Sequence, residues 1–340
     1  MVRGLLNSWT ISLVTSVILG FTLPLPRAQG APGAHSAGPD DFDRFNHAST
    51  PRDRQDKSVS AIAAMTPVVQ SLFDKGQRAL RARQYDQAIA DFSAALNTNP
   101  PAAAAVFILR FRTDAYIAKG ELDRALADAD RMVQLAPADF RGYQVRGRVY
   151  RRKDQPDKAI TELTIALRLN PTFAQLYNNR GIAYDYKGQH QRAIQDYNQA
   201  IRLAPGAIDG YVNRGGSYYS LHDFDRAMAD YNHALRIDPS DADTHFNRAV
   251  IYEEKGDLRA ALADYTMAAR YNPSDPAVHE ALAEICAKTG DFAAAIKHQS
   301  RAINTKGVSP AARVEIQRRL SDYRERKAVR KELTLHKAPR

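Results

Sequence analysis

The sequence predicts an all-α protein built as a superhelical solenoid, and three observations carry this prediction. Prolines recur every 34 residues through most of the chain, small residues recur at fixed places within each period, and tyrosine recurs beside them. A fixed period of this length is typical of chains in which one helical unit repeats and buries its core only by stacking on its neighbours. The periodic prolines are Pro137, Pro171, Pro205, Pro239 and Pro273.

The first thirty residues, 1–30, predict a signal peptide. Arg3 precedes a stretch from 5 to 25 without charge, whose apolar centre is 11–23, and Ala28-Gln29-Gly30 offers the small residues that a signal peptidase reads. The alternative is an uncleaved membrane anchor, because 21 uncharged residues can span a bilayer. Serine, threonine and asparagine dilute the stretch and favour cleavage. We expect an exported protein, periplasmic or secreted, with anchoring by the uncleaved signal as the alternative.

Residues 31–58 predict a disordered linker. Glycine, proline, histidine, serine and interspersed charges leave too little apolar surface for this segment to fold alone. Order should begin near Ser60. Thr66 and Pro67 suit the start of a helix, because a hydroxyl can cap the first turn and proline fits the first helical position.

Seven repeats are predicted within 59–309. Pro100 lies 37 residues before Pro137, which is one period plus an insertion of three residues. Proline at position 32 of a repeat ends its second helix and sets the turn into the next repeat. The repeats are 69–102, 106–139, 140–173, 174–207, 208–241, 242–275 and a degenerate 276–309.

Small residues recur at two positions counted from the first residue of each repeat. Position 20 is alanine in all seven repeats and position 8 is small in six, with Thr113 as the exception. Small side chains at both positions let the two helices of one repeat approach closely, where a larger side chain would overpack. Position 11 is a large ring beside that contact, namely Tyr116, Tyr150, Tyr184, Tyr218 and Tyr252.

This pattern resembles the tetratricopeptide repeat, a helix–turn–helix unit, over about 240 of the 340 residues. The resemblance implies a superhelix whose first helices line a concave groove. It also implies a protein-binding scaffold or adaptor, and names no partner.

The last segment, 310–340, predicts a capping helix and a basic tail. The spacing of Val314, Ile316, Leu320 and Tyr323 fits one more helix, which would cover the apolar face of the last repeat. The charges from about Arg326 onward suggest a frayed end. Ten Lys or Arg and four Asp or Glu between 313 and 340 supply +6 of the formal charge of +10. The alternative function is therefore binding of an anionic polymer or membrane surface through this helix and tail.

No pattern in the sequence indicates an enzyme. A phosphate-binding glycine loop, a His-Glu-x-x-His zinc motif and a cysteine pair are all missing, so we predict no catalytic residue, cofactor or metal. Cys286 is the only cysteine and takes the place of a buried tyrosine, where a thiol behaves as a small apolar group. His245 and His279 are interpreted as packing residues. Binding to nucleic acid is not expected.

Two positions change together along the chain. Position 7 is basic in six repeats and position 23 is acidic in the same six, while repeat seven has Leu282 and His298 instead. Joint presence and joint absence predict an ion pair between the two positions, with a basic stripe for acidic ligands as the alternative. The basic residues are Lys75, Arg112, Arg146, Arg180, Arg214 and Arg248, and the acidic residues are Asp91, Asp128, Glu162, Asp196, Asp230 and Asp264.

A peptide-binding groove is predicted on the concave face of repeats three to six. Position 6 is Asn179, Asn213 and Asn247 in successive repeats, and an amide can pair with the backbone of an extended peptide. The resemblance extends to the asparagine ladder of long tetratricopeptide superhelices, and a solvated polar face is the alternative. Aromatic contact and a change of charge along the groove would come from Tyr186, Tyr219, Arg148, Arg151, Arg152, Asp243, Glu253 and Glu254.

Overall fold

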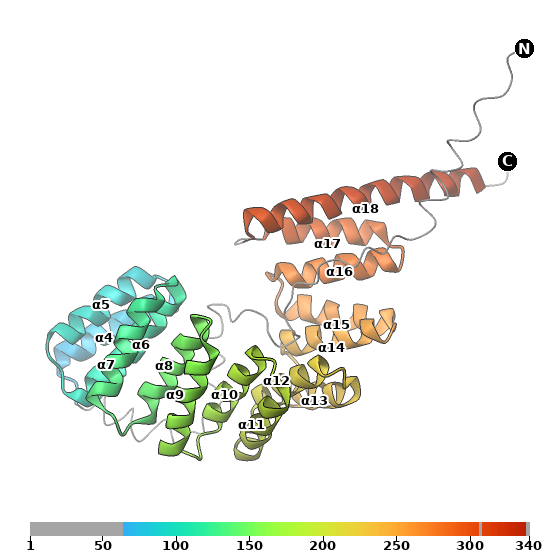
Figure 1. Cartoon of the computed structure of the whole chain (residues 1–340). Coiled ribbons are helices and arrows are strands. Elements are labelled where there is room, and N and C mark those ends of the chain that lie inside the picture. Colours follow the sequence, from blue (N-terminus) through green and yellow to red (C-terminus); the bar gives the residue numbers. More distant parts are fainter. Residues whose placement is uncertain (1–63, 306–307, 338–340) are drawn as a thin grey trace, which may run out of the picture.

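The computed structural model describes residues 64–305 and 308–337, and this part of the chain forms fifteen α-helices and no strand (Figure 1). The predicted all-α solenoid is confirmed. The predicted signal peptide, 1–30, and linker, 31–58, lie outside the described residues.

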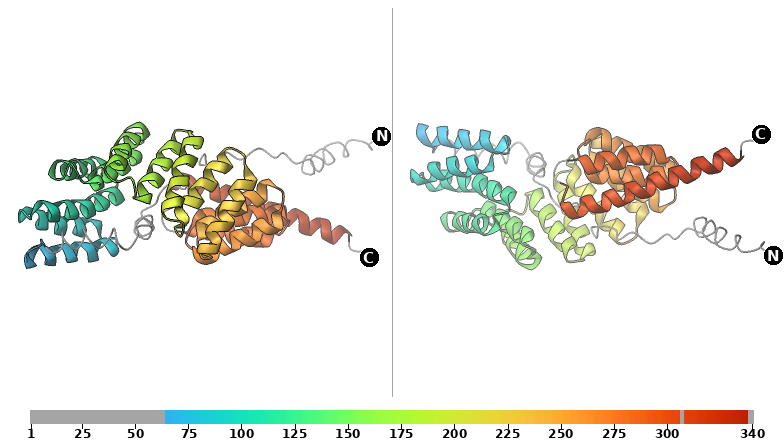
Figure 2. Two further views of the ribbon diagram at one scale, coloured as in Figure 1. Left: turned by 90° about the horizontal axis from the view of Figure 1, so that it is seen from below. Right: turned by 90° about the horizontal axis from the view of Figure 1, so that it is seen from above.

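The first fourteen helices form seven pairs, each joined by a short turn and packed against its partner. Successive pairs follow one curved path from the first pair to the last (Figures 1 and 2). The pairs are α4 (Pro67–Arg81) with α5 (Tyr85–Asn97), α6 (Ala102–Lys119) with α7 (Leu122–Leu135), α8 (Phe140–Arg152) with α9 (Pro156–Leu169), α10 (Ala174–Tyr186) with α11 (His190–Leu203), α12 (Ile208–Ser220) with α13 (Phe224–Ile237), α14 (Ala242–Glu254) with α15 (Leu258–Tyr271), and α16 (Pro276–Lys288) with α17 (Phe292–Asn304).

Helix starts and turns follow local chemistry. Thr66 caps α4, its hydroxyl accepting a hydrogen bond from the Val69 amide at 3.4 Å, and Pro67 takes the first helical position, as predicted. The turn inside a pair needs one residue with a left-handed backbone. Glycine supplies it at Gly256, where φ is +78°, whereas His222 adopts the same region at +58° with a side chain that strains it.

The insertion before repeat two lengthens a helix. α6 has 18 residues, whereas the first helices of repeats three to seven have 13. The added turn lies at its amino-terminal end, where Ala104 and Ala105 are buried. The three extra residues are therefore absorbed into the helix and not into a loop, and two of them join the core.

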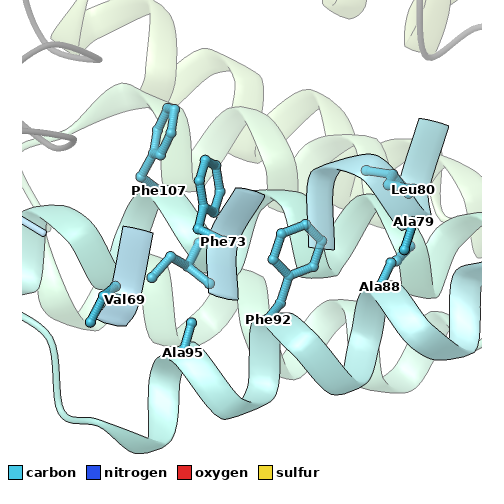
Figure 3. Close-up of a cluster of buried hydrophobic side chains, with 10 residues drawn as sticks. Val69, Phe73, Ala79, Leu80, Ala88, Phe92, Ala95 and Phe107 are labelled. Carbon is cyan, nitrogen blue, oxygen red and sulfur yellow. The ribbon is translucent and has the colours of Figure 1, made fainter. Parts of the chain in front are cut away.

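The core runs along the whole stack, and its fully buried aromatic residues are phenylalanines at the start and tyrosines in the middle. Figure 3 shows the start of the stack, where Phe73 and Phe92 of the first pair pack with Phe107 of α6. Phe111 of α6 joins these rings, and the contacting ring centroids are 5.2–6.1 Å apart. In the middle repeats a tyrosine at position 24 takes the central place instead. An added Cβ at Gly215 would meet the ring of Tyr231 at 2.6 Å, which explains the small residue at position 8.

The first helices of the pairs lie on the inner side of the curve. Successive first helices touch one another as well as their own partners, with contacts from α4 to α6, α6 to α8, α8 to α10, α10 to α12 and α12 to α14. We call the surface formed by these helices the inner face. It is the surface on which the predicted groove residues lie.

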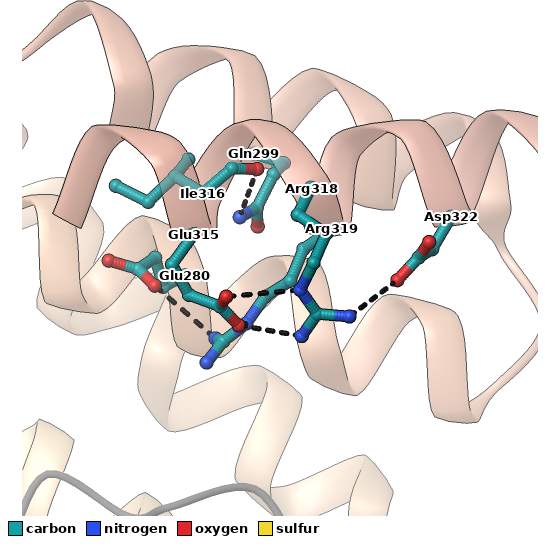
Figure 4. A network of polar contacts seen from close by, with 7 residues as sticks. All are labelled: Glu280, Gln299, Glu315, Ile316, Arg318, Arg319 and Asp322. Carbon is teal, nitrogen blue, oxygen red and sulfur yellow. Dashed lines mark hydrogen bonds and ion pairs between the residues drawn. The ribbon is translucent and has the colours of Figure 1, made fainter. Parts of the chain in front are cut away.

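A last helix, α18 (Pro310–Lys337), packs on α17 and extends past it (Figures 1 and 2). Ile316 and Leu320 are buried beneath it, whereas Val314 is 72% exposed. Figure 4 shows the polar contacts: the Gln299 side chain donates to the Ile316 carbonyl at 3.2 Å, and Arg319 pairs with Glu280 at 3.3 Å. The helix continues well beyond the expected fraying, because no glycine or proline interrupts it before its end.

Candidate protein-binding face and its supporting ion pairs

The arginines at position 7 form a regular series of ion pairs that we call the arginine ladder. In repeats five and six the guanidinium donates through Nε and Nη2 to both carboxylate oxygens at position 23 of its own repeat. For Arg248 and Asp264 these distances are 2.7 and 2.8 Å. The rungs are Arg112–Asp128, Arg146–Glu162, Arg180–Asp196, Arg214–Asp230 and Arg248–Asp264. The predicted ion pair is confirmed in these five repeats. It does not form in repeat one, where Asp91 accepts a hydrogen bond from Gln87 and not from Lys75.

Each rung also reaches back to the preceding repeat, which the sequence analysis missed. The remaining nitrogen of Arg248, Nη1, donates to the Asn232 side chain at 2.7 Å, and Asn232 is position 25 of repeat five. The same contact joins Arg112 to Ser93, Arg146 to Asp130, Arg180 to Thr164 and Arg214 to Asn198. A short polar side chain at position 25 was the available signal.

The ladder is part of the packing and not a surface for ligands. Its acids are nearly buried; Asp264, for example, is 5% exposed. Tyrosine rings flank the guanidinium groups, and Arg180 lies 6.0 Å from the ring centre of Tyr177 and 5.8 Å from that of Tyr184. Burial acts to raise the pKa of Asp264, but hydrogen bonds from Arg248 and His245 outweigh it and hold that pKa below its usual value.

A second series of ion pairs, the lysine ladder, runs along the exposed turns. Lysine at position 14 pairs with aspartate at position 18 of the preceding repeat. The pairs are Lys119–Asp86, Lys153–Asp123, Lys187–Asp157 and Lys255–Asp225. Where the lysine is missing, at Leu221 and Thr289, the preceding aspartate is missing as well, since Gln191 and Arg259 take its place.

The three asparagines predicted as one wall have different environments on the inner face. Asn179 is half-buried and accepts a hydrogen bond from Gln175 at 3.2 Å, and Asn213 is half-buried and donates to Asn178 at 3.0 Å. Asn247 is 1% exposed, and its Oδ1 has no hydrogen-bond partner among the described residues. Two of the three amides therefore lie at the surface. Asn247 is a correction: packing covers it, so its loss would disturb the core.

The basic residues of repeat three are partly neutralised. Arg148 forms an ion pair with Asp114, the residue at the same position of repeat two, and Asp114 is 7% exposed. Arg151 lies over the ring of Tyr186 at 5.8 Å, and that ring is 47% exposed. Arg152 is half-buried on the same helix turn.

The acidic residues of repeat six are engaged in the same way. Glu253 pairs with Lys288 of repeat seven and accepts a hydrogen bond from the Tyr265 hydroxyl at 3.0 Å. Glu254 is exposed and accepts from the Tyr219 hydroxyl at 3.3 Å, which joins two predicted site residues of neighbouring repeats. Asp243 is half-buried. The predicted change of sign along the inner face is thus reduced at Arg148 and Glu253.

A polar cluster around Asp185 lies between the two charged ends, and the sequence analysis did not find it. The carboxylate accepts hydrogen bonds from Tyr197 at 2.8 Å and Ser217 at 2.8 Å, and His190 Nδ1 lies 2.9 Å away. Burial raises the pKa of Asp185 despite these partners. The available signal was an acid at position 12 with a tyrosine at position 24, a combination that Glu253 and Tyr265 repeat.

Cys286 is buried, and burial raises the pKa of its thiol, with Asp291 adding to the effect. Within the described residues, no three histidine, cysteine or carboxylate side chains gather where they could hold a metal ion. Across 64–305 and 308–337, helices that are both long and apolar enough to cross a membrane are also absent.

Models of the tetratricopeptide repeat match most of the stack. One matches residues 73–140 and 246–310, another 174–206, and a third 215–256, and together they cover more than half of the chain. The chain belongs to the tetratricopeptide-repeat family. Members of this family are in general protein-interaction scaffolds and not enzymes, so the fold supports a protein-binding role.

Solved structures agree with this fold. A tetratricopeptide repeat protein from Parabacteroides merdae is similar with a TM-score of 0.59 and 16% identity, covering 75% of this chain and all of that one. PilW, a type IV pilus biogenesis factor, is similar with a TM-score of 0.54 and 17% identity, and the match covers 62% of this chain and 98% of PilW. PilF of Pseudomonas aeruginosa is similar with a TM-score of 0.53 and 15% identity, and the match covers 64% of this chain and 99% of PilF. At these identities the likeness shows the fold alone. Among curated protein sequences, none matches this chain.

Proposed function

We propose that this protein is an exported scaffold or adaptor that binds an extended peptide or protein partner along the inner face of repeats three to six. The observation that carries the proposal is that two sets of polar side chains differ in what they contact. The arginine ladder uses its cations to join helices, whereas the inner face keeps amides and a ring at the surface. Asn179 and Asn213 are half-buried and Tyr186 is exposed there, so all three can reach a partner.

The partner should be extended, apolar at one point and charged unequally at its ends. Tyr186 supplies an aromatic contact backed by Arg151, and aromatic and arginine side chains often dominate binding energy. Arg151 and Arg152 would meet an acidic end of the partner, and Asp243 and Glu254 a basic end. Binding at Arg148 and Glu253 would compete with their ion pairs to Asp114 and Lys288. Tyr219 would act together with Glu254, to which it is bonded.

Export rests on the leader, and it has a direct test. Trp9 is the only tryptophan of the chain and lies before the cleavage site expected near Gly30. The mature protein should therefore show tyrosine emission alone. Protein recovered from outside the cytoplasm that shows tryptophan emission would retain its leader and act as an anchored protein instead.

The binding face is tested by capture of partners with the mature chain, followed by affinity measurement with each purified partner. Asn179→Ala with Asn213→Ala, and separately Tyr186→Ala, should weaken binding while circular dichroism stays unchanged. Each lost hydrogen bond nets about 0.5–1.5 kcal/mol, so the double variant should bind about 5- to 150-fold more weakly. Gln191→Ala, a matched amide truncation on the outer helix α11, should leave affinity unchanged.

Two outcomes oppose the proposal. Full affinity in both inner-face variants would exclude this face as the site. A chain ending at Lys327 keeps the buried part of α18, with Ile316 and Leu320, and loses much of the basic tail. Loss of binding in that truncation, with strong salt dependence, would favour the anionic polymer or membrane surface as ligand.

A further inference from the structure

A pocket of about 680 Å³ lies where α15, α16 and α17 meet, away from the inner-face residues considered above. Its lining includes Thr266, Arg270, His279, Leu282, His298 and Arg301. Three of these residues stand at the positions that form the arginine ladder in the preceding repeats.

The pocket is a rung of the ladder without its guanidinium group. In repeat six, Arg248 fills the corresponding place and contacts Asn232 and Asp264. In repeat seven, Leu282 stands in the place of the arginine and His298 in the place of the acid, while Thr266 keeps the short polar side chain at position 25. A leucine does not reach as far as an arginine, so space that the ladder fills elsewhere stays open here.

The charge of this rung is reversed. No acidic residue is among those described as lining the pocket, whereas Arg270 and Arg301 both line it. Lys297 also acts on His298 electrostatically. Every other rung of the arginine ladder has a carboxylate at its centre. A cationic ligand would therefore be repelled by this pocket. An anionic ligand could accept charge-assisted hydrogen bonds from the two guanidinium groups.

A pair of histidines forms the polar end of the pocket. His279 Nε2 lies 3.0 Å from the Pro273 carbonyl and donates to it, so its Nδ1 can accept from His298 Nδ1 at 3.4 Å. The rings stack with centroids 5.6 Å apart. In repeat six the equivalent histidine, His245, has the Asp264 carboxylate as its partner at 3.0 Å. Among the described residues that line the pocket, no carboxylate lies beside the pair in repeat seven.

We propose that this pocket, the anion pocket, binds one oxyanion group, a carboxylate or a phosphate, between Arg270, Arg301 and the histidine pair. The anion would supply the negative charge that Asp264 supplies one repeat earlier. Burial and the charges of His279, Arg301 and Lys297 lower the pKa of His298 to about 4, and a bound anion opposes the effect of those charges. Binding is therefore coupled to proton uptake at His298, and this coupling strengthens it as pH falls from neutral toward that pKa. This site is independent of the inner-face function.

The test follows the imidazole resonances of His298 in the full-length chain during titration with inorganic phosphate and, separately, with acetate. Each anion should raise the apparent pKa of His298. The shift is about one unit if the anion binds the protein with protonated His298 about tenfold more tightly than the protein with neutral His298. Stronger binding of phosphate indicates a phosphorylated ligand, whereas acetate binding of equal or greater strength indicates a carboxylate of a peptide. The absence of any anion-dependent shift would overturn the proposal.

Two variants and one control fix the location. Arg301→Gln leaves His298 observable and should abolish most of the shift. Leu282→Arg with His298→Asp rebuilds the rung found in repeat six and should remove phosphate binding measured by calorimetry. Arg259→Gln, which changes an exposed arginine of α15 outside the lining, should bind as the parent does. Unchanged phosphate binding in the rebuilt rung, or an unchanged His298 shift in Arg301→Gln, would place the anion elsewhere and refute the pocket.

Discussion

Repeats six and seven use the same helical frame to hold opposite charges. In repeat six, Arg248 joins Asp264 to the preceding repeat, and the acid is nearly buried. In repeat seven the same two places hold Leu282 and His298, and a cationic pocket opens beside them. The frame therefore does not dictate the ion pair. The two side chains appear or disappear as a unit.

This coupling has a physical cause. A single buried charge whose partner is removed costs far more than the pair contributes, so a chain that loses one member does best to lose the other. The lysine ladder shows the same joint loss, where Leu221 coincides with Gln191 and Thr289 with Arg259, although its exposed charges do not carry this burial cost. At two independent sets of positions, opposite charges are thus present together or absent together.

The largest expected effect comes from breaking the rung of repeat six. Arg248→Leu leaves Asp264 nearly buried with the His245 ring as its remaining side-chain partner, and should lower the free energy of unfolding by about 3–5 kcal/mol. Adding Asp264→His, which reproduces the composition of repeat seven, should recover more than half of that loss. Urea unfolding followed by circular dichroism measures both. A double variant less stable than the single one would show that the rungs are not coupled units.

The two repeats should also differ in their response to acid. The folded pKa of Asp264 is depressed, so its contribution is present above the ordinary value of 3.8 and is lost only as pH falls below it. The folded pKa of His298 is depressed from 6.5 to about 4, so the unfolded chain takes up its proton first, and repeat seven loses stability as pH falls through this window. The protection factors of the amides in α17, which compare each exchange rate with the intrinsic rate at the same pH, should therefore fall between pH 6.5 and 4 in a buffer with weakly binding anions. Those of the amides in α15 should not. His298→Asn should remove the difference.

The fold could be predicted from the sequence because its signal is periodic. Proline, small residues and tyrosine recur at fixed positions, and the pairing of positions 7 and 23 could be inferred from their joint loss at Leu282 and His298. The contact from position 7 to the preceding repeat was missed because serine, aspartate, threonine and asparagine at position 25 share only their short polar form.

The surroundings of the candidate site residues could be predicted only in part, because the exposure of a side chain does not repeat with the sequence period. Asn179, Asn213 and Asn247 share a position, yet Asn247 is covered by packing while the other two remain half-buried. Arg148 and Glu253 carry the predicted charges, but residues one period away in the sequence, or close to it, pair with them. Such pairing depends on how neighbouring repeats are stacked, which side-chain identity at one position does not reveal. Binding by this face stays a prediction.

A smaller effect compares the turns of repeats five and six. His222 holds φ at +58°, whereas Gly256 holds +78° at the equivalent turn. His222→Gly should raise the free energy of unfolding by about 0.5–1 kcal/mol, because glycine adopts this backbone without steric strain. The histidine ring also touches Phe224 edge-on at 5.9 Å, and loss of that contact limits the gain. Gly256→Ala should act in the opposite direction, and thermal unfolding of the two variants measures the contrast. Equal and like-signed shifts would contradict the strain argument.

The smallest expected effect concerns the missing rung of the lysine ladder between repeats four and five. Leu221→Lys with Gln191→Asp would supply the pair found at Lys255 and Asp225. Both partners of that model pair are largely exposed, and exposed pairs stabilise weakly because water competes and side-chain entropy is lost. We expect a small rise in Tm at low salt that disappears at high salt, because screening removes a surface ion pair but leaves packing unchanged. Either single substitution alone should give no gain. A rise in Tm that persists at high salt would come from replacing the exposed Leu221 and not from the ion pair. The lysine ladder would then contribute no measurable stability, unlike the buried arginine ladder.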